Sequence, residues 1–174
     1  MAPISNLKAQ VVPVLASNVA YAKVSCVVIN PIGIIKIRDM NFGSIISGQA
    51  GSVTLPPDGG RPVTSGNVML ETSKNVISTA TFQVSDNQGN SATSVHYVTG
   101  YTISLPTSEV ILTNESGQTM RVGNFTSIPS ASAFGAFTNG ESTLSVGATL
   151  YVNEQQGLGQ YASVTSFPVT VNYY

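Results

Sequence analysis

Short runs of β-branched and aromatic residues, separated at close intervals by turn-forming residues, dominate this chain. Such runs favour strands, because branched and aromatic side chains pack well on a pleated surface. The intervening clusters, such as 56–60 (PPDGG) and 114–117 (NESG), supply the φ angles that tight turns need. No convincing run has apolar residues at helical spacing. The pattern predicts an all-β protein with strands at 21–29, 32–37, 51–55, 68–71, 80–85, 101–105, 120–127, 142–151 and 164–173.

The balance of charged and apolar residues predicts a sizeable core. Charged residues make up 9 % of the 174 residues and hydrophobic residues 42 %, the opposite of a disordered chain. Seven basic and eight acidic side chains lie scattered, for a net charge of -1. Without a basic cluster the chain lacks the electrostatic signature of a nucleic-acid binder or of a polybasic membrane patch. Many short strands at this spacing predict a two-sheet sandwich.

The first twenty residues differ from the rest, and we expect them to form an N-terminal extension preceding a domain at 21–174. Pro13 makes this segment an edge strand or an unusual one. It resembles a signal peptide poorly, since Lys8 is its only basic residue, and we expect that a signal has already been removed. No run approaches the ~20 apolar residues that span a bilayer, so no membrane insertion is expected. One apolar face is formed by Leu7, Ala9, Val11, Pro13, Leu15 and Val19.

The residue types that carry chemistry are sparse, and we predict no catalytic residue, cofactor or metal. His96 is the only histidine, and beside Ser94 and Asp86 it is better interpreted as a polar residue on an exposed strand than as part of a catalytic triad. The single cysteine, Cys26, lies in an apolar run and is expected to be a buried hydrophobic residue, with an intermolecular bridge as the alternative. Loop 86–90 (DNQGN) is interpreted as a turn, not a calcium site.

An ordered set of motifs resembles one family of secreted proteins. The stretch 39–45 (DMNFGSI) resembles a D-L-N-F-G-x-I signature that follows the first strand in that family. Further matches are 59–61 (GGR), 80–84 (ATFQV), 101–106 (YTISLP), 146–152 (VGATLYV), 159–161 (GQY) and 167–173 (FPVTVNY). Together they cover about residues 21–174. The family is domain of unknown function 4402, which is similar to the pilin subunits of chaperone–usher fimbriae.

This resemblance implies an incomplete immunoglobulin-like β-sandwich that lacks its seventh strand. A neighbour's N-terminal extension would supply the missing strand, which makes a head-to-tail homopolymer. The last predicted strand has no partner after it, which agrees with this expectation. We therefore expect residues 4–20 to lie beside strand 164–174 of the next subunit. That strand's inward face, comprising Phe167, Val169, Val171 and Tyr173, is predicted to form the acceptor groove.

The implied function is that of a major pilin in an extracellular cell-surface fimbria that serves adhesion or biofilm formation. Secretion through the periplasm, with a chaperone and an usher as partners during assembly, follows from the same resemblance. Two alternatives stay open. The chain could be a self-complete monomeric surface or adhesin module, in which residues 1–20 fold back onto their own domain. It could also be a capsid or decoration protein, since jelly rolls share this composition.

Overall fold

The computed structural model describes residues 19–46, 48, 50–71, 76–87 and 99–174. Within this part the chain forms thirteen strands and no helix, so the all-β prediction is confirmed. None of its segments is a helix long and apolar enough to cross a membrane. The strands are β1 Gly33–Arg38, β2 Ser44–Ile46, β3 Gly51–Leu55, β4 Val63–Gly66, β5 Met69–Glu71, β6 Ala80–Ser85, β7 Gly100–Ser104, β8 Val110–Thr113, β9 Thr119–Ile128, β10 Gly135–Ala136, β11 Glu141–Val152, β12 Ala162–Ser163 and β13 Thr170–Tyr173.

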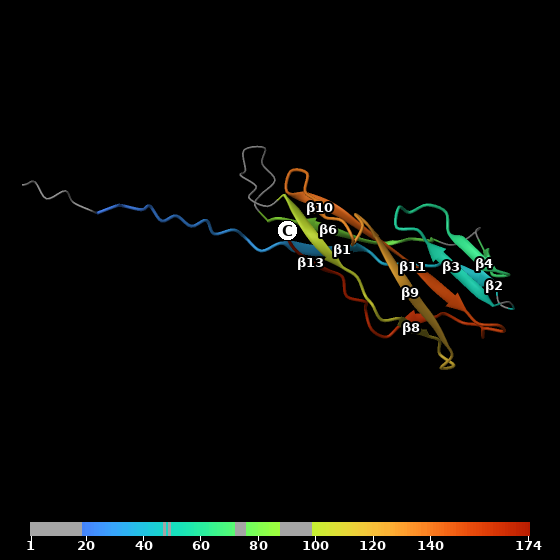
Figure 1. The fold of residues 1–174 in the computed structure, drawn as a ribbon. Coiled ribbons are helices and arrows are strands. Elements are labelled where there is room, and N and C mark those ends of the chain that lie inside the picture. Colours follow the sequence, from blue (N-terminus) through green and yellow to red (C-terminus); the bar gives the residue numbers. More distant parts are fainter. Residues whose placement is uncertain (1–18, 47, 49, 72–75, 88–98) are drawn as a thin grey trace, which may run out of the picture.

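The long strand β11 organises the larger sheet. That sheet has the order β1-β6-β11-β9-β8-β12, and β3 and β4 extend it from β11 (Figure 1). The first half of β11 pairs with β6, and the second half pairs with β3 along the same edge. Gly147 lies where the partner changes, and a side chain there would overlap the carbonyl oxygen of Leu55. Glycine therefore allows three strands to meet at one point.

Two smaller sheets, β10-β7-β13 and β2-β5, cover the inner face of the large sheet. Alternate residues of β11 point inward, as the period-two pattern of a strand requires. They are Leu144, Val146, Ala148, Leu150 and Val152, and all are buried. Towards one end they pack against Tyr101, Ile103 and Val171 of the first small sheet. Towards the other end they pack with half-buried Ile45 and Leu70 of the second. The result is a two-layer, sandwich-like all-β fold.

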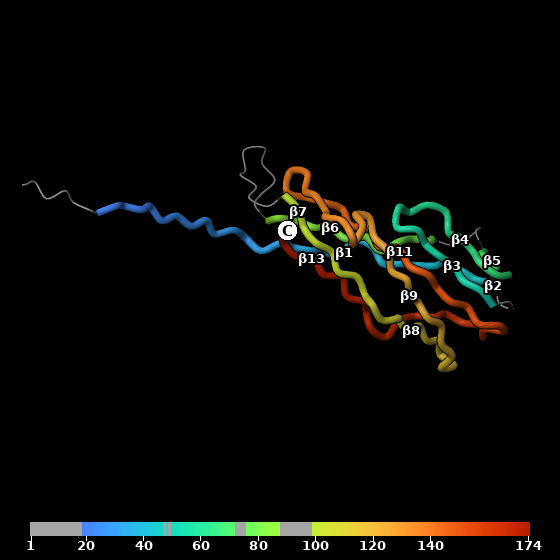
Figure 2. Tube along the Cα trace, viewed as in Figure 1, coloured from blue at the N-terminus to red at the C-terminus, as the bar shows by residue number. Residues whose placement is uncertain are grey.

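The prediction of a strand at 21–29 is wrong. Residues 19–31 form no strand and no ladder hydrogen bonds to the rest of the described chain, and all of these residues are exposed. Figure 2 shows this segment leaving the molecule beside the C-terminus and β13, at the end opposite β2, β4 and β5. The prediction that Cys26 is buried is also wrong, since its side chain is exposed. The residues have strand propensity, but none of the described strands pairs with them.

Candidate functional site

A groove of about 850 Å³ opens between the two layers. Its floor is the inner face of the large sheet and comprises Ala80, Phe82, Val110, Leu112, Met120, Val122, Leu150 and Val152. One wall is formed by residues 39–45, which lead into β2. The opposite wall is formed by residues 156–163 together with Ser166 and Phe167. A second hollow of about 540 Å³ lies on the far side of Phe167, against residues 105–111.

The groove exposes side chains of the type that normally fill a core. Leu150 and Val152 on its floor are buried, but Met40, Ile45 and Phe82 are only half-buried although they pack against the core clusters. Large apolar side chains gathered in one hollow are typical of an interaction surface or a ligand-binding groove. The core of this sandwich is therefore incompletely closed along the groove.

Strands near both walls have an edge without a partner in the described part of the chain. β13 pairs with β7 on one side only, and β2 pairs with β5 on one side only. An open strand edge presents backbone N–H and C=O groups in the spacing that another strand requires. The groove can thus accept an extended peptide by both apolar contacts and main-chain hydrogen bonds.

The first wall owes its shape to the stretch 39–45 (DMNFGSI). The backbone N–H of Gly43 donates to the Asn41 side-chain oxygen at 2.8 Å, and Gly43 has a φ of 77°, a left-handed value that glycine adopts without strain. The main chain of Asn41 bridges Ser78 through hydrogen bonds of 2.8 and 2.9 Å. This turn directs Phe42 into the core, where it is buried. The asparagine and glycine make the turn, and the phenylalanine fixes it to the core.

A polar cluster fixes the opposite wall. The Tyr161 hydroxyl donates to the Gly157 carbonyl at 2.9 Å and accepts from the Gln156 amide at 2.8 Å. The Asn114 amide, in the turn between β8 and β9, lies 3.2 Å from the same hydroxyl. The Asn114 side-chain oxygen in turn accepts from the backbone N–H of Gln118 at 2.8 Å. These bonds join loop 153–161 to the β8–β9 turn and hold the loop in place as a wall of the groove.

The predicted inward face of the last strand is confirmed. Phe167, Val169 and Tyr173 are half-buried and Val171 is buried, whereas Pro168, Thr170 and Asn172 are exposed. Their roles differ, however. Phe167 lines the groove and packs on Phe125, with ring centroids 5.1 Å apart. Val169 and Val171 pack in the subunit's own core, and Tyr173 bonds to Asn30 of the segment 19–31. None of these three residues lines the groove.

Of the predicted donor residues, Leu7, Ala9, Val11, Pro13 and Leu15 lie outside the described residues. Val19 is described and is 62 % exposed, on the segment that leaves the molecule. His96 and Ser94 also lie outside the described residues. In the described ranges, no group of three His, Cys, Asp or Glu side chains could hold a metal ion.

The exit of residues 19–31 is fixed by a small clasp. The Asn30 amide donates to the Asn87 carbonyl, and the Asn87 amide donates to the Pro31 carbonyl, each at 2.7 Å. The Tyr173 hydroxyl donates to the Asn30 carbonyl. Burial raises the pKa of Tyr173, and the charge of Asp86 adds to the rise, so this hydroxyl keeps its proton. Sequence patterns gave no signal for this clasp, because the two residues that each hydrogen bond joins are 56 or more positions apart.

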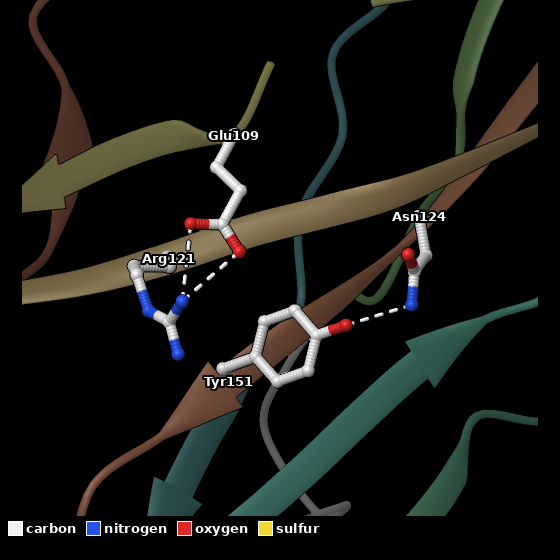
Figure 3. A network of polar contacts seen from close by, with 4 residues as sticks. All are labelled: Glu109, Arg121, Asn124 and Tyr151. Carbon is white, nitrogen blue, oxygen red and sulfur yellow. Dashed lines mark hydrogen bonds and ion pairs between the residues drawn. The ribbon is translucent and has the colours of Figure 1, made fainter. Parts of the chain in front are cut away.

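The outer face of the large sheet carries a separate polar network (Figure 3). Both carboxylate oxygens of Glu109 lie 3.1 Å from one guanidinium nitrogen of Arg121. The central guanidinium carbon of Arg121 lies 5.3 Å from the centroid of the Tyr151 ring. Asn124 donates to the Tyr151 hydroxyl at 2.7 Å. The network links β9 to β11 from outside. Its ion pair is solvent-exposed, so it adds little stability.

Comparison with known proteins gives one match. No curated protein and no solved structure shows significant similarity to the chain. The family described as Domain of unknown function (DUF4402) matches residues 32–173, which begins at the first strand and ends with the last. The match covers both walls and the floor of the groove. The chain therefore belongs to the DUF4402 family, as the ordered motifs indicated.

Proposed function

We propose that the chain is a structural subunit, the major pilin, of an extracellular cell-surface fimbria. Its subunits join head to tail, with a strand from the N-terminal extension of one subunit lying in the groove of the next. The observation that carries this proposal is the open groove, a half-exposed apolar core flanked by strand edges without partners. A sandwich with its final strand missing has these two features at the same place.

Several terms would contribute to the stability of the joint between a donor strand and the groove of its acceptor. Burying four or five apolar side chains of a donor strand yields about 6–15 kcal/mol, at about 1.5–3 kcal/mol each. Ordering the peptide costs about 1–2 kcal/mol per residue. Two further terms offset that cost: ladder hydrogen bonds along the groove, and the closing of the acceptor's own core over Phe82, Ile45 and Phe167. Release then requires partial opening of the acceptor, which makes dissociation slow.

The direction of the N-terminal segment favours a polymer over a closed molecule. Residues 19–31 leave at the end opposite β2 (Figure 1), so they would have to reverse direction to reach their own groove. Donation from one end to the other end of a neighbour is a heterologous contact, and repeated it builds an open fibre. A periplasmic chaperone and an usher, adhesion and biofilm formation belong to this proposal through the pilin resemblance. The runner-up is a monomeric surface module, in which the segment does reverse.

Electron microscopy of cells that express and export the chain tests the proposal. Immunogold label raised against the chain should follow surface filaments with one subunit per repeat. Ile45→Lys places a charge in the groove and should abolish filaments, while the matched Ile35→Lys, at a 59 % exposed position of β1, should leave them. Circular dichroism and a denaturant curve of each secreted variant check folding. Cells with abundant surface antigen but only monomers would contradict the proposal and favour the monomeric module.

A further inference from the structure

We propose that the strand that fills the neighbour's groove is residues 19–29, not residues 7–15. In this register one face of the strand enters the groove, comprising Ala20, Ala22, Val24, Cys26 and Val28. The inference rests on the proposed function and identifies which segment acts as the partner of the groove.

The exposure of this segment in the single chain is the first argument. Tyr21, Val24 and Val28 are 94, 97 and 91 % exposed, although their types favour strands. Residues 24–29 (VSCVVI) carry no charge and no proline, which is the composition of a segment that pairs with any open strand edge. A segment of this kind is prone to aggregate unless another strand pairs with it or covers it. A second copy of the chain offers such cover in its groove.

The period-two pattern gives the register. All five even-numbered residues from 20 to 28 are apolar. The odd-numbered face carries Lys23 and Ser25 at its middle, so that face suits solvent. In a strand these two sets point to opposite sides, and the apolar even set then meets the groove floor.

Proline argues against the more N-terminal register. A strand in the groove would form ladder hydrogen bonds to the open edges of β13 and β2, and its N–H groups must donate in those bonds. Pro13 has no N–H and interrupts such a ladder. Residues 19–30 contain neither proline nor glycine, so they can form an uninterrupted strand.

Length supports the same choice. An eleven-residue strand at about 3.3 Å per residue extends about 36 Å, close to the length of twelve-residue β11, whose Leu150 and Val152 line the groove floor. The clasp at Asn30 and Pro31 would then lie at the groove mouth, with adjacent subunits in contact. Placing residues 7–15 in the groove would leave residues 16–29 as an apolar linker between subunits, exposed over a length of up to about 46 Å.

Cys26 supplies a direct test, because it is the only cysteine and is exposed in the free chain. A maleimide should label the free subunit readily. In purified filaments the thiol faces the groove floor, and labelling should be at least about ten-fold slower, since it must wait for local opening. Filaments dissociated in guanidinium should label fully, which shows that the thiol is intact. Equal labelling of filaments and free chain would overturn the inference while leaving the fimbrial function standing.

A matched pair of substitutions gives an independent readout. Val24→Asp should block filament formation, whereas the same change at Val11→Asp should leave it intact. Since Val24 is exposed in the free chain, its variant should have an unchanged denaturant curve. The reverse outcome, with Val11→Asp blocking and Val24→Asp tolerated, would refute the register. Absence of filaments from the unaltered chain would instead refute the proposed function itself.

Discussion

Replacing Phe167 by alanine separates the stability of the free subunit from that of the joint. The ring is half-buried in the single chain, packs on Phe125 and forms part of the groove wall. In the fimbria a donor strand would cover the remainder of the ring. The same substitution should therefore cost more in the assembled state than in the free state.

The magnitudes follow from burial. A fully buried Phe→Ala change costs about 3–5 kcal/mol, so a half-buried ring should cost about 1.5–2.5 kcal/mol in the free subunit. With the donor strand in place the full cost applies, and the excess of about 1.5–2.5 kcal/mol falls on the joint. Since 1.4 kcal/mol is a factor of ten in an equilibrium constant, the joint should weaken by about ten- to sixty-fold.

The assay compares two measurements on one variant. Denaturant unfolding of the free subunit, followed by circular dichroism, gives the first cost, and the dissociation rate of filaments at fixed denaturant reports the second. Val84→Ala serves as the control, because Val84 is fully buried and lies away from the groove. It should lower the stability of the free subunit and leave the joint unchanged. Equal effects of Phe167→Ala on both would refute the idea that the groove is closed by a neighbour.

Three further predictions concern the fold. Val171→Asp should destabilise the free chain by more than about 3 kcal/mol in a denaturant curve, because it buries a charge in the core, while Asn172→Asp on the exposed side should stay within about 0.5 kcal/mol. Gly147→Ala should lower the free energy of unfolding by at least about 2 kcal/mol, since the added methyl overlaps backbone, and an unchanged midpoint would contradict the packing described. Burial raises the pKa of Tyr101 above its ordinary 10.0, an effect that its bond to Ser142 partly offsets. Stability should therefore decline as pH rises above about 10, and Tyr101→Phe should make that decline shallower when unfolding is measured from pH 9 to 11.

Local patterns were sufficient to predict most of the strands. The predicted strands 51–55 and 80–85 coincide with β3 and β6, because each is a short alternating run ended by turn residues. The inward parity of the last strand followed for the same reason, since opposite faces of a strand differ in polarity. Short strands such as β4 and β10 were missed, because they contain few strongly apolar residues and depend on their partners.

Only the tertiary structure decided which strand-like segments find a partner. Residues 21–29 have the composition of a strand, yet they remain unpaired, and Cys26 is exposed with them. Propensity describes how well a residue fits a pleated surface and does not say whether a neighbouring strand exists. A groove beside the last strand was expected, but of the four residues predicted for it only Phe167 lines the groove. The walls at 39–45 and 156–163 are more than a hundred positions apart, and they lie together only because β11 pairs with β6, β3 and β9 in one sheet.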